Sequence, residues 1–185
     1  MTHSENINNR YWHPNIWPPF TQIKTSSPQI EVSHGKDSLI FTKNPDRTLI
    51  DGISSWWVTL HGHGNEYISD AIAKQAKKLE QIIFADFLHP QAKLLSERLS
   101  RISKLERLFF SDNGSSAVEV ALKIAYQWWQ NNGELRNQII AFDGAYHGDT
   151  FGAMALGERN IFNDSFKNLM FPVKRVPWPI YLDRR

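Results

Sequence analysis

A short apolar run that ends in a polar turn and continues as a long amphipathic helix lies in the middle of this 185-residue chain. The Leu-Phe-Phe run is typical of a buried strand over residues 107–110. Apolar residues then recur at the three-and-four spacing of one helix face over residues 115–131. The pattern predicts a strand, a tight turn and a helix that Asp112 or Asn113 caps, with Gly133 just past the helix end.

The turn before this helix has the chemistry of an anion site. A helix that follows such a turn presents unpaired backbone N–H groups at the positive end of its dipole, which suits a phosphate. Gly114 allows close approach of the backbone, and Ser115 and Ser116 add hydroxyl donors. An ordinary capped helix after a buried strand would show the same pattern, so both interpretations stay open.

Composition limits the classes of function. The net charge is only +2, and Lys74, Lys77 and Lys78 suit the solvated face of one predicted helix, so no nucleic-acid partner is predicted. No stretch approaches the roughly 20 apolar residues that cross a bilayer, and residues 1–10 lack the apolar core of a secretory signal. The absence of cysteine excludes disulfides and thiolate chemistry. We therefore expect a soluble, cytoplasmic protein without a membrane partner.

The N-terminal third has little periodic pattern. Residues 1–30 predict an irregular arm. The aromatic residues with which this arm can pack against another surface are Trp12, Trp17 and Phe20. Two β-type runs, 38–42 and 48–50, flank a turn-rich Lys-Asn-Pro-Asp-Arg sequence and predict a hairpin. In an extended segment, Trp56 and Trp57 would point to opposite sides, one indole inward and the other into a pocket.

Helices and strands alternate in the rest of the chain. The predicted elements are helices over 66–79, 90–102 and 115–131, a strand over 138–142 and a short helix that ends at Leu156. This alternation predicts an α/β fold with a parallel sheet, in which ligands lie at the carboxyl ends of the strands. The polar loops at 111–116 and 143–150 both follow predicted strands, which favours a site formed by the two loops.

Together, the two loops suit a planar phosphorylated cofactor. Gly114 and Ser115 would hold the phosphate, and Tyr146 would stack on the ring, although packing in a half-buried position is an equal alternative for Tyr146. His147 is expected to be a satisfied loop histidine rather than a group that polarises the cofactor. The His-Gly-His run at 61–63 has no third ligand nearby, so no metal site is predicted.

Three separated motifs resemble the class III pyridoxal-phosphate-dependent aminotransferases in order and spacing. The motifs are Asp51–Trp57, Ser111–Glu119 and Tyr146–Gly152, within a resemblance that extends from about Trp12 to about Gly157. Within the family, the Trp56–Trp57 pair resembles the sequence of one branch in particular. Enzymes of that branch transfer an amino group from S-adenosylmethionine to 8-amino-7-oxononanoate. That reaction gives 7,8-diaminononanoate in biotin biosynthesis. The ornithine and acetylornithine branches are less similar.

The resemblance implies part of an α/β, fold-type I transferase: a segment of the small domain plus the first part of the large, mostly parallel-sheet domain. Residues 1–62 would be the arm and hairpin segment of the small domain, and residues 63–185 an incomplete large domain that binds the cofactor. The resemblance also implies pyridoxal 5′-phosphate as cofactor, small-molecule substrates and a homodimer.

The family's residue roles carry over onto matching motifs. The resemblance implies that Gly114 and Ser115 bind the cofactor phosphate and that Tyr146 stacks on the pyridine ring and borders the substrate. It also implies that Trp56 lines the substrate pocket. Phe20 stands where the family often has a pocket tyrosine, and a phenyl ring has no hydroxyl to bond to the substrate.

The resemblance places the family's remaining catalytic groups past residue 185. These groups are the Schiff-base lysine, the carboxylate that pairs with the pyridine nitrogen and the arginine that binds the substrate carboxylate. No catalytic residue is therefore predicted within the chain, which we expect to be an N-terminal part of an enzyme and inactive alone. Two alternatives stay open: another class III enzyme acting on an ω-amino acid or diamine, or a non-catalytic interaction remnant that has lost the cofactor.

Overall fold

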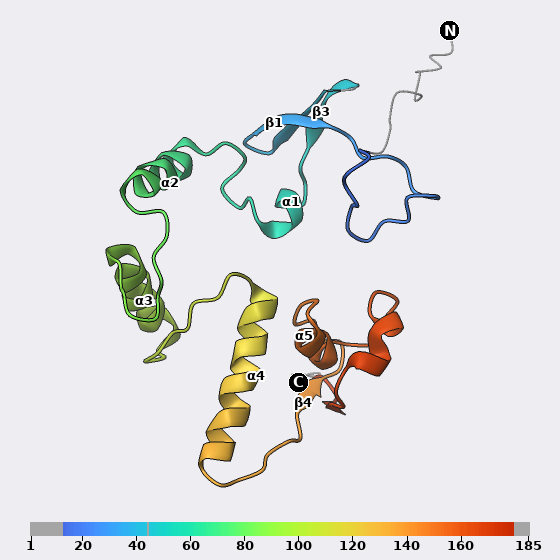
Figure 1. The fold of residues 1–185 in the computed structure, drawn as a ribbon. Coiled ribbons are helices and arrows are strands. Elements are labelled where there is room, and N and C mark those ends of the chain that lie inside the picture. The colour runs from blue at the N-terminus through green and yellow to red at the C-terminus, as the bar shows by residue number, and fades with distance from the viewer. Residues whose placement is uncertain (1–12, 44, 180–185) are drawn as a thin grey trace, which may run out of the picture. The chain divides into compact units, whose positions relative to one another are not determined.

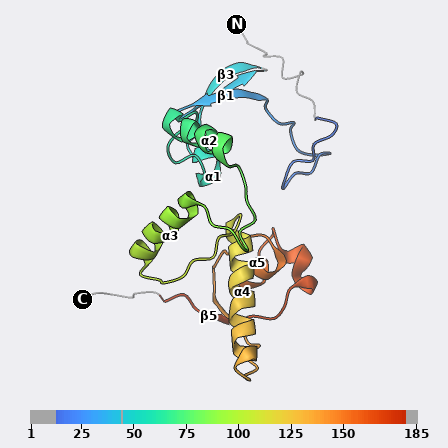
Figure 2. The same ribbon diagram turned by 60° about the vertical axis from the view of Figure 1, so that its left-hand side comes forward.

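The computed structural model describes residues 13–43 and 45–179, and Figures 1 and 2 show its ribbon from two directions. The chain forms two compact units, one that ends at Leu88 and one that begins at His89. The domain boundary predicted between residues 62 and 63 stays a prediction, because a compact unit within part of a fold need not coincide with a domain. No helix in the described part of the chain is long and apolar enough to cross a membrane.

The first unit contains a three-stranded antiparallel sheet in the order β1-β2-β3. Its strands are β1 (Val32–Lys36), β2 (Leu39–Lys43) and β3 (Asp46–Ile50). The predicted hairpin is confirmed by β2 and β3, which pair from Leu39 opposite Ile50 to Lys43 opposite Asp46. The third strand, β1, was not predicted; a bulge interrupts its pairing with β2 between Val32 and His34. Trp12, in the predicted irregular arm, lies outside the described residues, and residues 13–31 contain no helix or strand.

The tryptophan pair lies in a left-handed turn, α1 (Ser54–Trp57), rather than in the predicted extended segment. The four residues of this turn have φ angles of 49°, 45°, 65° and 70°. Left-handed helical backbone costs roughly 1–2 kcal/mol per non-glycine residue, so the turn must be stabilised by its surroundings. Successive side chains of a helical turn are about 100° apart, and both indoles are exposed, Trp56 at 61% and Trp57 at 71%.

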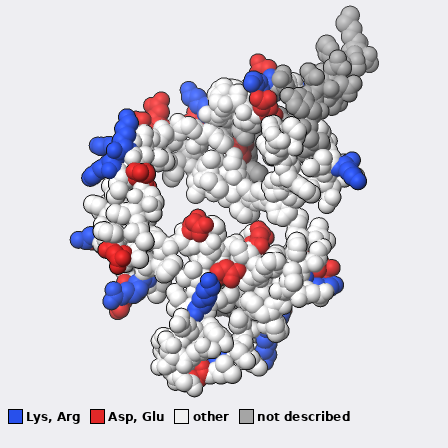
Figure 3. Space-filling model, viewed as in Figure 1, with Lys and Arg blue, Asp and Glu red and all other residues white. Residues whose placement is uncertain are grey.

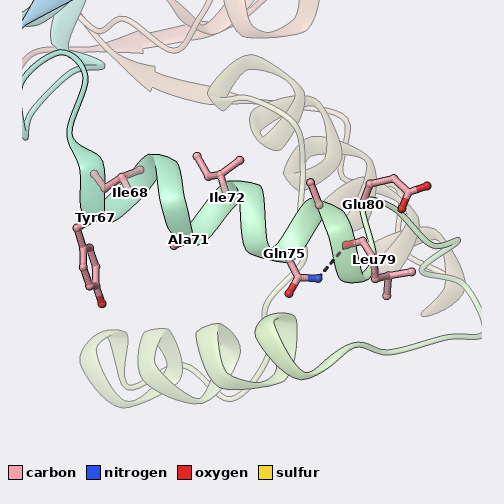
Figure 4. Close-up of a pocket in the computed structure, with 8 residues that line it drawn as sticks. Tyr67, Ile68, Ala71, Ile72, Gln75, Leu79 and Glu80 are labelled. Atoms are coloured by element: carbon pink, nitrogen blue, oxygen red, sulfur yellow. Dashed lines mark hydrogen bonds between the residues drawn. The ribbon is translucent and has the colours of Figure 1, made fainter.

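The predicted helix over 66–79 is confirmed as α2 (Glu66–Lys78), whose N-terminus is capped by Asn65 Oδ1, which accepts from the Ile68 N–H at 3.1 Å. Basic side chains gather over α2 in Figure 3, where Lys77 and Lys78 are exposed in the last turn of the helix. The apolar face of α2 lines an open groove of about 440 Å³, which Figure 4 shows. Its lining residues are Tyr67, Ile68, Ala71, Ile72, Gln75, Ala76, Leu79 and Glu80.

In the described part of the second unit, residues 89–179, there are three helices, a 3₁₀ helix and a parallel pair of strands. These are α3 (Pro90–Ser103), α4 (Gly114–Asn131), β4 (Ile140–Phe142), α5 (Phe151–Leu156), η2 (Asp164–Leu169) and β5 (Lys174–Val176). Pro90 occupies the first turn of α3, and Gly133 follows α4 with a φ of 75°, both as predicted. β4 and β5 are parallel, and α4 packs against α5, which lies beside it in Figure 1.

The strand predicted over residues 107–110 is wrong. The Leu-Phe-Phe run has neither helix nor strand structure, and Phe109 is 68% exposed. A strand requires a neighbour with which to form a hydrogen-bonded ladder. Within the described residues, the ladder of this unit joins β4 and β5, and the run belongs to neither strand although it has the composition of one.

The short helix α5 forms the buried centre of the second unit. Its residues from Gly152 to Leu156 are all buried. The last carbonyls of α5 accept from two arginines: Arg159 Nη1 donates to Met154 O at 2.8 Å, and Arg175 Nη2 donates to Ala155 O at 2.9 Å. Arg175 also donates to the carbonyls of Leu156 and Gly157. Positive charge at this end complements the helix dipole and satisfies carbonyls that have no partner within the helix.

Replacing Arg175 with methionine is expected to lower the free energy of unfolding by about 2 kcal/mol, because buried carbonyls of α5 would lose a charged donor. The measurement is urea denaturation of the variant and the parent protein. Arg98→Met, on the exposed surface of α3, is the matched control and should change stability by less than about 0.5 kcal/mol. Equal losses in the two variants would contradict a specific role for Arg175.

Candidate functional site

The N-terminus of α4, where the sequence predicts an anion site, is a capped helix start beside open space. Asn113 Oδ1 caps the helix by accepting from the Ser116 N–H at 2.9 Å. Among the described residues, no acceptor is found for the N–H groups of Gly114 and Ser115. A Cβ added at Gly114 would meet nothing within 4 Å, so the space beside the first turn is open. Two backbone donors therefore face an accessible space at the positive end of an 18-residue helix.

Ser115 connects this helix start to the loop at 143–150. Its Oγ accepts from the Asp149 N–H at 3.0 Å, so the hydroxyl keeps its own proton to donate to a ligand. The contact requires glycine at position 148, which has a φ of 121°. A Cβ there would lie 2.0 Å from Ser115 Oγ and 2.8 Å from Ser115 Cβ. The two loops therefore meet through a close approach that no larger residue at position 148 permits.

Tyr146 is held in the same loop by Asp149. The tyrosine hydroxyl donates to Asp149 Oδ2 at 2.8 Å. Tyr146 is nevertheless 71% exposed. This hydrogen bond to the carboxylate raises the pKa of Tyr146, and partial burial adds to the effect. The tyrosine therefore stays protonated at neutral pH, with its hydroxyl anchored.

Asp149 links two of the predicted site residues, because its backbone binds Ser115 and its carboxylate binds Tyr146. The structure thus brings Gly114, Ser115 and Tyr146 into one connected region, although their roles toward a cofactor stay predictions. Asp149 itself was not singled out from the sequence. The sequence feature that could have identified Asp149 is its position three residues after Tyr146, in a polar loop that follows a predicted strand.

Glu119, one helical turn after Ser115 in α4, binds the start of α5. Its Oε1 accepts from Thr150 Oγ1 at 2.6 Å, from the Gly152 N–H at 2.7 Å and from the Ala153 N–H at 3.2 Å. The Thr150 hydrogen bond is the largest of several effects that lower the pKa of Glu119, and partial burial opposes them. Sequence reasoning missed this residue, yet Ser115 and Glu119 are four apart and so lie on one helix face.

The predicted substrate residue Trp56 lies in the first unit and contacts Phe20. Their ring centroids are 6.2 Å apart, with a tilt of 49° between the planes. Phe20, which stands where the family often has a pocket tyrosine, is therefore a neighbour of Trp56, the residue predicted to line the pocket. His63 pairs with Asp51, and no group of three or more potential metal ligands occurs among the described residues.

The residues near the start of α4 fit a phosphorylated, planar cofactor. The first turn of α4 has open space beside Gly114, and two backbone N–H groups and the Ser115 hydroxyl there can donate to the acceptor oxygens of a phosphate. The exposed Tyr146 ring offers a flat apolar face, and its hydroxyl is already satisfied by Asp149. The arrangement can therefore hold an anionic group and an aromatic ring in one ligand.

Comparison with known families agrees with this geometry. Residues 22–184 match the family model described as aminotransferase class-III. The chain belongs to the class III aminotransferase family, and the predicted fold class is confirmed as part of that fold.

A similar curated relative is the adenosylmethionine-8-amino-7-oxononanoate aminotransferase of Synechococcus elongatus, which is 53% identical over 169 residues. The matched segment covers 90% of this chain and 40% of that relative. The relative of the same name in Geobacter sulfurreducens is 37% identical, with 89% and 37% covered. The chain thus spans about two fifths of the length of these relatives.

Solved structures give the same picture. The crystal structure of adenosylmethionine-8-amino-7-oxononanoate aminotransferase from Methanocaldococcus jannaschii matches with a TM-score of 0.83 and 32% identity, over 91% of this chain and 40% of that one. A PLP-bound amine transaminase from an uncultivated Pseudomonas species matches with a TM-score of 0.79 and 26% identity. The match covers 90% of this chain and 39% of the transaminase chain.

Proposed function

We propose that the protein is a pyridoxal-phosphate-dependent aminotransferase of biotin biosynthesis, which moves the amino group of S-adenosylmethionine to 8-amino-7-oxononanoate. The single observation that carries the cofactor assignment is the connection of Ser115 to Tyr146 through Asp149. The 53% identity to a relative named for these compounds supports the substrate assignment. The proposal concerns the product of the complete reading frame, because the relatives are longer than this chain.

Each site residue has a binding role in this proposal. The N–H groups of Gly114 and Ser115 and the Ser115 hydroxyl donate to the cofactor phosphate. Tyr146 stacks on the cofactor ring and borders the substrate, held by Asp149 at 2.8 Å. When bound, the cofactor supplies the electron sink that amino-group transfer requires. The chain's own contribution is to bind and orient that group.

Trp56 is proposed to line the substrate pocket. It offers an exposed indole beside the Phe20 ring, and neither aromatic face carries a formal charge. Such surface suits both the aliphatic chain of an oxononanoate and the flat base of an adenosyl group. We further propose that the active protein is a cytoplasmic homodimer, as the family resemblance implies.

The test uses the purified product of the complete reading frame. With pyridoxal phosphate, S-adenosylmethionine and 8-amino-7-oxononanoate, it should form 7,8-diaminononanoate, and the gene should let a strain that lacks this step grow without biotin. A donor screen with ω-amino acids and diamines is the control. Turnover with those donors and none with S-adenosylmethionine would favour the other class III activity. No cofactor absorbance band on adding pyridoxal phosphate would favour a non-catalytic remnant.

A further inference from the structure

The left-handed turn of Trp56 and Trp57 is held by a nearly buried carboxylate. The Asp51 side chain is only 4% exposed, and its Oδ2 accepts from Ser55 Oγ at 2.8 Å and from His63 Nε2 at 2.8 Å. An ionised carboxylate can only accept, so both partners donate. Asp51, Ser55 and His63 form one group, called here the Asp51 cluster. Hydrogen bonds from the Ser55 backbone and then from its hydroxyl, with a smaller one from His63, lower the pKa of Asp51 to about 2 despite the opposing effect of burial, which keeps the carboxylate charged.

The Asp51 cluster is anchored at two points to the turn that joins β1 and β2. The Asp51 N–H donates to Ser38 O at 2.8 Å. His63 pairs with Asp37 through two backbone hydrogen bonds, of 2.8 and 3.0 Å. The His63 ring lies against Gly35, where an added Cβ would be 2.6 Å from His63 Cγ. The imidazole therefore has a fixed position from which to reach Asp51.

The turn's own backbone bonds do not explain its handedness. The Trp57 N–H donates to Ile53 O at 2.8 Å, and the Val58 N–H donates to Ser54 O at 2.9 Å. A right-handed turn makes bonds of the same kind without the steric cost that Cβ atoms impose on the left-handed form. Ser55 donates its hydroxyl to Asp51 from inside the turn and so links the turn to the Asp51 carboxylate.

We infer that the Asp51 cluster holds this turn in its left-handed form and thereby positions the Trp56 indole for substrate. Asp51, Ser55 and His63 are positioning residues, since they act through Trp56. The inference rests on the proposed function, in which Trp56 lines the pocket. Loosening the turn should weaken substrate binding and leave the chemical step intact, because none of the three residues belongs to the proposed cofactor site around Ser115.

The kinetic test uses the holoenzyme made from the complete reading frame. Ser55→Ala and His63→Ala should each raise KM for a substrate about tenfold, the effect of losing one hydrogen bond to a charged group, with kcat within about twofold of the parent value. His63→Gln keeps an N–H donor and should recover most of the loss. Gly35→Ala should reproduce His63→Ala by displacing the ring. The control, His61→Gln, changes an exposed histidine two residues away and should have parental constants.

A second measurement separates this inference from the proposed function. Amide exchange at Trp57 and Val58 should speed up in Ser55→Ala and His63→Ala, while exchange in the β2–β3 pair stays as in the parent. Unchanged exchange in both variants would overturn the cluster's role whatever the enzyme's substrates are. Faster exchange together with a fall in kcat and an unaltered KM would overturn the claim that the cluster positions Trp56 for substrate binding. If the parent enzyme is inactive with S-adenosylmethionine, the proposed function is wrong. The exchange rates would still decide whether the cluster holds the turn.

Discussion

Gly148→Ala is expected to weaken pyridoxal phosphate binding about 30-fold, which corresponds to losing a charge-assisted hydrogen bond of ~2 kcal/mol. The new methyl group would lie 2.0 Å from Ser115 Oγ and 3.0 Å from Ser115 Cα, so the start of α4 and the loop must separate. That movement takes the Ser115 hydroxyl away from the phosphate and Asp149 away from Ser115. The measurement is a titration of the apoprotein with pyridoxal phosphate, followed by absorbance.

The control for this variant is Gly144→Ala in the same loop. Gly144 also has a positive φ, 71°, but the nearest atom to an added Cβ is Glu158 Oε2 at 3.9 Å. The control therefore also replaces a glycine of positive φ in this loop, but without a collision. If both variants bind the cofactor with equal affinity, the close approach of Gly148 to Ser115 does not form the phosphate site.

Glu119→Ala is expected to lower the free energy of unfolding by about 3 kcal/mol, because three donors at the start of α5 lose their common acceptor. Two of those donors are the backbone N–H groups of Gly152 and Ala153, in the buried part of α5. The loss is measured by urea denaturation. Glu97→Ala, at an exposed position on α3, removes a carboxylate without such partners and should cost less than about 0.5 kcal/mol. Matching losses would show that Glu119 contributes only its charge.

The same residue gives stability an acid dependence of known sign. The hydrogen bond from Thr150, followed by those from Gly152 and Ala153, lowers the pKa of Glu119 in the folded state. The contribution of Glu119 is therefore fully present above its unfolded pKa, near 4.5, and is lost as the pH falls through the lower folded pKa. In Glu119→Gln this part of the acid loss should disappear, and an unchanged pH profile would contradict the assignment.

Local patterns were sufficient to predict the helices and the hairpin. The helices α2, α3 and α4 have the predicted bounds to within one residue at each end, because their apolar spacing is regular and their caps are recognisable. The capped start of α4 was predictable for the same reason, since a glycine and two serines follow the capping Asn113.

Features that depend on distant residues were not predictable. The Leu-Phe-Phe run has the composition of a strand, but pairing depends on a neighbour that composition does not reveal. The left-handed turn at Trp56 contradicts local backbone preference, and its contacts extend from Ser55 to Asp51 and His63, which lie outside the turn. Likewise, Asp149 and Glu119 acquire their contacts only when segments more than 30 residues apart come together.

The two ends of α5 receive their partners from opposite directions along the chain. Glu119 precedes this helix, whereas Arg175 follows it. Because a ribosome releases the chain from its N-terminus, the acceptor for the first turn is already present when α5 emerges, whereas Arg175, the donor to the carbonyls of Ala155 and Leu156, is not. A nascent chain that stops shortly after Leu156 would expose an apolar helix with unsatisfied carbonyls, which is a surface that chaperones bind. The second unit should therefore complete its folding in one late step, once Arg175 has been synthesised.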